Sequence, residues 1–171
     1  MDHRKALAAL TAVTLCIGCA SARWTLVKHF RDPGEVLQTF PEQVWAEYDC
    51  DTQKRPFFMI ERNQLTPQKV RAGGDFGHRL VYVMCPDRPT EVVEGRLSTR
   101  IRFRGRPIVR QTDTHYEIKP GRWMVDALVH LPENAEPGVY AYEVEFESDR
   151  LVFEKSLTFV VVETRAKSPA S

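Results

Sequence analysis

The stretch RLSTRIRFRGRPIVR, residues 96–110, decides the class of fold. Its side chains alternate between apolar and polar with a period of two, which is typical of a β-strand with one buried face. The apolar positions are Leu97, Thr99, Ile101 and Phe103, and the polar positions are Ser98, Arg100, Arg102 and Arg104. Gly105-Arg106-Pro107 is a turn signal, and Ile108 and Val109 begin a return run. The stretch therefore predicts a β-hairpin centred on Gly105-Arg106.

The same period of two recurs along most of the chain. Further runs cover 44–49, 58–60, 80–85, 123–131, 140–147 and 151–161. Turn signals separate them, mostly at spacings typical of short antiparallel strands. Seven or more such runs predict an all-β fold, an antiparallel β-sandwich of about seven to nine strands over residues 44–165. We expect residues 23–43 to be a tether, with a short helix over 34–40 as an alternative to an extended chain. We expect residues 166–171 to be a flexible tail.

The N-terminal residues 1–22 are typical of a signal peptide. A basic start containing Arg4 and Lys5 precedes an uncharged run over 6–18 that is too short to span a bilayer. LCIGC, residues 15–19, resembles a bacterial lipobox, with Cys16 where Leu is usual. That resemblance implies lipidation of Cys19 and, with Ala20 and Ser21 following, an outer-membrane lipoprotein facing the periplasm. The alternative is A-x-A cleavage after Ala22, which gives a soluble periplasmic protein.

The cysteine count agrees with export. Either cleavage leaves Cys50 and Cys85 as the remaining pair of free thiols in an oxidising compartment. We therefore expect a Cys50–Cys85 disulfide, while two unpaired buried cysteines remain the alternative. Neither residue belongs to a C-x-x-C pair, so no metal site is predicted at them.

Two segments resemble immunoglobulin-like domains. LPENAEPGVYAYEVEF, residues 131–146, is similar to the late strands of these domains, where a loop ends in Pro-Gly-x-Tyr. LTPQKVRAGGDFGHRLVYVMC, residues 65–85, resembles the first strands of bacterial members. The resemblance covers about 57–163 and implies an Ig-like sandwich with Tyr140 at the tyrosine corner, its hydroxyl bonded to the preceding loop. Such sandwiches serve many functions, so the fold alone names none.

The arginines allow two interpretations. If the hairpin strand pairs with 140–147, then Arg100, Arg102 and Arg104 face Glu143, Glu145 and Glu147, and the charges are structural. If the glutamates lie elsewhere, these arginines with Arg106 form a patch for an anionic envelope component or an envelope protein. Residues 104–107, RGRP, resemble the core of an AT-hook, but the alternation indicates an ordered strand. Without the leader the chain holds 22 basic and 22 acidic residues, so no nucleic-acid partner is predicted.

Catalytic patterns are weak. His78 with Asp75, and His115 with Asp113, are candidate loop sites for a hydrolase or metal enzyme. No recognised metal spacing or nucleophile motif accompanies them, so no cofactor or metal is predicted. We therefore expect a non-enzymatic envelope module that binds or scaffolds another component, is held to the membrane through a lipid anchor, and has an unidentified partner. The enzyme using these His and Asp residues is the alternative.

Overall fold

A computed structural model describes residues 34–163, which form two packed β-sheets and one short helix. In chain order the elements are β1 (Gly34–Thr39), α2 (Pro41–Glu47), β2 (Phe57–Thr66), β3 (Lys69–Arg71), β4 (Asp75–Cys85), β5 (Val93–Phe103), β6 (Arg106–Ile118), β7 (Gly121–His130), β8 (Gly138–Glu147) and β9 (Val152–Val162). The predicted signal peptide with Cys19, and the predicted tail, lie outside the described residues.

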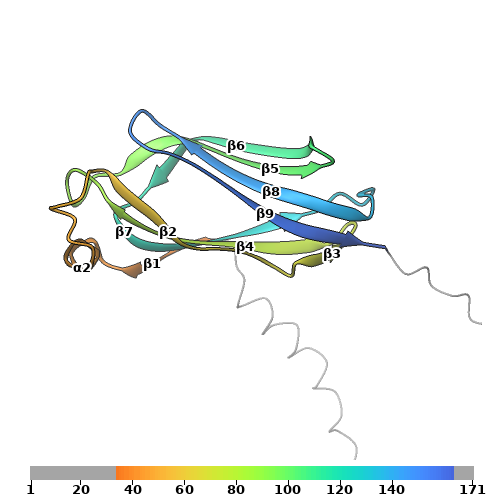
Figure 1. Ribbon diagram of the computed structural model, residues 1–171, viewed down its shortest axis with the longest axis horizontal. Helices are drawn as coiled ribbons and strands as arrows, with labels where there is room; N and C mark the ends of the chain where they lie inside the picture. Colours follow the sequence, from red (N-terminus) through yellow and green to blue (C-terminus); the bar gives the residue numbers. More distant parts are fainter. Residues whose placement is uncertain (1–33, 164–171) are drawn as a thin grey trace, which may run out of the picture. The chain divides into compact units, whose positions relative to one another are not determined.

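The strands are shared between a four-stranded and a five-stranded sheet. The first sheet has the order β1-β7-β4-β2, and the second has the order β3-β9-β8-β5-β6. Figure 1 shows them as two layers, with α2 beside the first sheet. All pairings are antiparallel except that of β3 with β9, which is parallel. From β2 onward this is the immunoglobulin arrangement, with β8, β5 and β6 in the places of strands F, C and C′. The predicted all-β Ig-like sandwich is therefore confirmed.

The core lies between the two sheets and is rich in aromatic rings. Phe76, Tyr140 and Phe159 are almost fully buried and pack against one another. Farther along the strands, Phe58 stacks on Phe153 across the sandwich. Rings of this size bury large apolar areas, which is the main stabilising contribution in a domain with so little helix.

The N-terminal part of the domain differs from the prediction in two places. Residues 34–39 were predicted to belong to the tether, with a short helix as the alternative. They form strand β1, which pairs with β7. Residues 41–47, predicted as the end of the tether and the start of the first strand, form helix α2. Pro41 occupies the first turn of that helix, where its missing N–H costs nothing. The alternation of Val44, Ala46 and Tyr48 misled the prediction because positions 44 and 48 also share one face of a helix.

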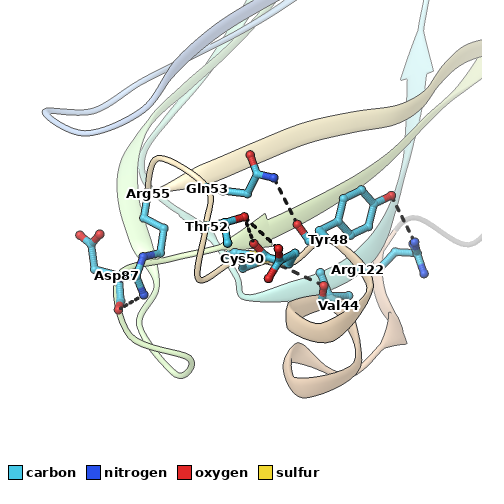
Figure 2. Close-up of a disulfide and its surroundings, with 10 residues drawn as sticks. Val44, Tyr48, Cys50, Thr52, Gln53, Arg55, Asp87 and Arg122 are labelled. Atoms are coloured by element: carbon cyan, nitrogen blue, oxygen red, sulfur yellow. Dashed lines mark hydrogen bonds between the residues drawn. A yellow bond between two sulfur atoms is a disulfide. The ribbon is translucent and has the colours of Figure 1, made fainter.

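Helix α2 is fixed to the outer face of the first sheet. Val44 is fully buried there with Val83 of β4, and Cys50, just after the helix, forms a disulfide with Cys85 (Figure 2). The predicted disulfide is thus confirmed, and its two Cα atoms are 6.1 Å apart. Because α2 covers this end of β4, the last four residues of the strand are buried on both faces.

Candidate functional site

The arginine stretch forms strand β5, the turn after it and the start of β6. In the β5–β8 ladder Arg100 lies directly opposite Glu143. Arg102 Nε lies 2.8 Å from Glu143 Oε2, and Arg100 is ion-paired with Glu145. The side chains of Arg100 and Glu143 are only 14% and 15% exposed. Their charges therefore hold two strands together on the outer face of the second sheet.

Arg104, unlike Arg100 and Arg102, does not pair with any of the three glutamates of β8 that it was predicted to face. Its guanidinium lies 3.4 Å from Glu136, while Glu147 pairs with Arg96. Arg104 and Gly105, with φ values of 50° and 77°, are the two residues between β5 and β6. Positive φ at both positions is typical of the turn that joins two antiparallel strands through a two-residue loop. The hairpin centre is thus Arg104-Gly105, one residue earlier than predicted, and Arg106 begins β6.

A cleft of about 460 Å³ opens between the two sheets, where β5 and β6 face β7. Its lining includes Leu97, Ile101 and Val109 from the second sheet and Val125, Ala127 and Val129 from the first. The lining also includes exposed residues, among them Leu128, Gln111 and His130, which place the mouth at the edge of the sandwich. Within residues 34–163, β1 pairs with β7 only as far as Asp126. Among the described residues, the remainder of β7 therefore has no strand on one of its edges beside the cleft.

Near the cleft, a polar cluster joins two segments that are distant in sequence. The Glu35 carboxylate of β1 accepts hydrogen bonds from the Tyr116 hydroxyl and from Lys119 Nζ, both at 2.6 Å. Burial and the neighbouring carboxylate raise the pKa of Tyr116. Tyr116 also lines the cleft. No pattern in the sequence indicates this cluster, because Glu35 lies in a segment that was predicted to be a tether.

The four candidate catalytic residues do not form one site. His78 lies inside β4, not in a loop, and its ring points into the core, where Nε2 is 2.8 Å from Asn63 Oδ1. Burial lowers the pKa of His78 to about 4. Asp75 instead contacts His130 Nδ1 at 2.8 Å.

The second predicted pair lies on strand β6 and not in a loop. The His115 backbone N–H donates to Asp113 Oδ1 at 3.0 Å, and the His115 ring contacts Glu94. Asp113 lines the cleft, but His78, Asp75 and His115 do not. Among residues 34–163, no group of three or more His, Cys, Asp or Glu side chains is arranged to hold a metal ion.

Tyr140 makes the contact that the Ig resemblance implied for it. Its hydroxyl donates to the backbone carbonyl of Glu136 at 2.7 Å, four residues upstream. This is the hydrogen bond of a tyrosine corner. It ties the loop before β8 to the strand and, through Glu136, lies beside the Arg104 ion pair.

Comparisons with known proteins add little to this geometry. No protein-family model and no curated protein matches the chain. Among solved structures, a family 123 glycoside hydrolase from Clostridium perfringens gives a TM-score of 0.43 at 14% identity, covering 56% of this chain and 22% of its own.

Two further solved structures resemble the chain to a similar degree. A Pseudomonas fluorescens alkylpurine DNA glycosylase bound to DNA gives a TM-score of 0.45 at 14% identity, covering 61% of this chain and 30% of its own. The sporulation control protein Spo0M from Bacillus subtilis gives a TM-score of 0.36 at 12% identity, covering 62% of this chain and 49% of its own. The chain thus spans less than half of each of these structures. Likenesses this distant carry no argument about function.

Proposed function

We propose that this protein is a non-enzymatic module of the cell envelope, exported and lipid-anchored at Cys19, that binds an apolar segment of another envelope component. The cleft between β5–β6 and β7 is the observation that carries the proposal. Its walls are mostly apolar, its volume is about 460 Å³ and its mouth is open, which are the properties of binding sites that enclose an apolar group. Among the described residues, no helix is long and apolar enough to cross a membrane.

An anionic ligand on the β5 arginines receives less support. Glu143 and Glu145 balance Arg100 and Arg102, so the outer face of the second sheet carries no uncompensated positive charge at these positions. We propose no catalytic function, because no observation favours one: His78 and Asp75 have different partners, and His115 contacts Asp113 through its backbone N–H and not through its ring.

Site-specific photocrosslinking in cells tests the binding proposal. A photoreactive residue at Leu128, 53% exposed at the mouth, is expected to give one discrete adduct. Ala127→Trp, which fills the cleft, is expected to abolish that adduct. Val139→Trp, at a position 65% exposed and outside the cleft lining, is the matched control and is expected to retain it. An adduct that is equally strong in both variants would contradict binding in the cleft.

The lipid anchor has a separate test. Intact-mass analysis of protein extracted from membranes is expected to show a chain that begins at an acylated Cys19. Cys19→Ala is expected to release the protein into the soluble fraction. A wild-type mature chain that begins at Arg23 would refute lipidation and leave the cleft proposal standing.

A further inference from the structure

Strand β6 is a long free edge. It has thirteen residues and occupies the end position of the second sheet, paired with β5 on one side. Within residues 34–163, no strand pairs with its other side. All of its residues are exposed except Val109, Tyr116 and Ile118. An edge of this length presents a row of backbone N–H and C=O groups that can pair with another strand.

Four charged side chains on this edge have no ionic partner among the described residues and are sorted by sign. Arg106 and Arg110 lie in its first half, and Asp113 and Glu117 in its second half. None of the four forms an ion pair with another described residue. A strand with charges of one sign repels a copy of itself in either direction. A sorted strand repels a parallel copy and attracts an antiparallel one.

Two irregularities limit how β6 can pair. The β5–β6 register shifts between Ile101 and Arg102 and again between Gly95 and Leu97. In each case β6 contributes the extra residue, so its regular part is 109–113. That window is centred on Gln111. An antiparallel pairing centred there places the half of one copy that contains Arg106 and Arg110 beside the half of the other copy that contains Asp113 and Glu117, and the twofold symmetry repeats this arrangement.

We propose that two copies of this chain associate by antiparallel pairing of their β6 edges across a twofold axis at Gln111. The two five-stranded sheets then form one continuous sheet, and charge complementarity selects the antiparallel direction. Because the second sheet forms one wall of the cleft, the second copy extends that wall. The association is weak, because so short a pairing buries less than the about 1,200–2,000 Å² typical of stable interfaces.

Sedimentation velocity over a series of protein concentrations tests the proposal. The series reaches about 1 mM, because a weak dimer is populated only at high concentration. Wild type is expected to shift from monomer to dimer. The double variants Arg106→Glu/Arg110→Glu and Asp113→Lys/Glu117→Lys, which give each edge a single sign, are each expected to lose about tenfold or more in association constant. An equimolar mixture of the two variants is expected to recover a dimer.

Lys69→Glu/Arg71→Glu is the matched control, because it reverses two exposed charges on β3, the other edge of the same sheet. It is expected to dimerise like wild type. Far-UV circular dichroism checks that every variant is folded. A monomeric wild type at the highest concentration, an unchanged dimer in the reversed variants, or a mixture that stays monomeric would each overturn the proposal. None of these outcomes bears on the cleft adduct, which has its own variants.

Discussion

The outer face of the second sheet and its free edge contain the same kinds of residue in different situations. On the face, Arg100 and Arg102 are at least partly buried and are paired with Glu143 and Glu145. On the edge, Arg106 and Arg110 are exposed and have no acidic partner among the described residues. One arginine-rich stretch therefore contains charges that are paired within the fold and charges that have no acidic partner among the described residues.

Removing a paired charge from the face is expected to have the largest effect. Glu143→Ala removes the carboxylate that pairs with Arg102 and lies opposite Arg100, while Arg100 keeps its ion pair with Glu145. Losing this largely buried carboxylate is expected to lower the free energy of unfolding by about 3 kcal/mol, the low end for breaking a buried pair, as measured by urea denaturation. Glu154→Ala, an exposed position on the same sheet, is the control, with a change below about 0.5 kcal/mol. An equal loss of unfolding free energy in both variants would contradict a special stabilising role of the paired charges on the face.

The core contains a titratable side chain, His78, whose hydrogen-bond partner, Asn63, is neutral. Because burial lowers the pKa of His78 to about 4 from about 6.5 in the unfolded chain, the unfolded state binds a proton first as the pH falls. The protonation of His78 therefore has no effect on stability above about pH 6.5. Between about pH 6.5 and 4 the protein is expected to lose about 3 kcal/mol of stability.

Chemical denaturation at a series of pH values measures this loss. His78→Leu is expected to be less stable at pH 7, because Asn63 loses its partner. Its stability is nevertheless expected to depend less on pH between 6.5 and 4 than that of wild type. The same pH dependence in both proteins would assign the acid loss to other groups.

A neutral hydrogen bond on the second sheet provides an intermediate effect. Tyr140→Phe removes the hydroxyl that donates to the Glu136 carbonyl and keeps the ring packed on Phe103. The expected loss is about 1 kcal/mol, the usual net value of such a bond, seen as a lower urea midpoint with an unchanged slope. No change in midpoint would mean that the tyrosine corner does not stabilise this domain.

The edge is expected to show the smallest effect on stability. Arg110→Glu changes an exposed side chain without a described ionic partner, so its unfolding free energy is expected to stay within about 0.5 kcal/mol of wild type. Its dimer association constant is nevertheless expected to fall. A loss of stability as large as that of Glu143→Ala would remove the distinction between face and edge.

The sequence predicted the sandwich because the alternation of Leu97, Ile101 and Phe103 recurs in other segments between turn signals. It also predicted the Cys50–Cys85 disulfide, since export leaves these two cysteines to pair. The first inference needs only the alternation within each strand, and the second needs only the number of cysteines. The Tyr140 contact followed from a resemblance in the loop before it.

The remaining features depend on which strands are neighbours, and local pattern does not determine this. Glu35 contacts Lys119 across 84 positions of sequence, and β1 pairs with β7 although the chain between them builds most of the second sheet. The cleft depends on which residues of β5 and β6 lie across the sandwich from β7. Helix α2 was missed because a seven-residue segment is too short for its period to distinguish a helix from a strand.

Amide hydrogen exchange at two protein concentrations tests the central distinction between face and edge most directly. Raising the concentration from dilute to about 1 mM is expected to slow exchange at residues 109–113 of β6, because weak pairing occupies their free backbone groups only at high concentration. Amides of β8, already paired on both sides, and of the other edge strand, β3, are expected to be unaffected. Exchange in β6 that does not depend on concentration, or an equal slowing at β3, would contradict the account.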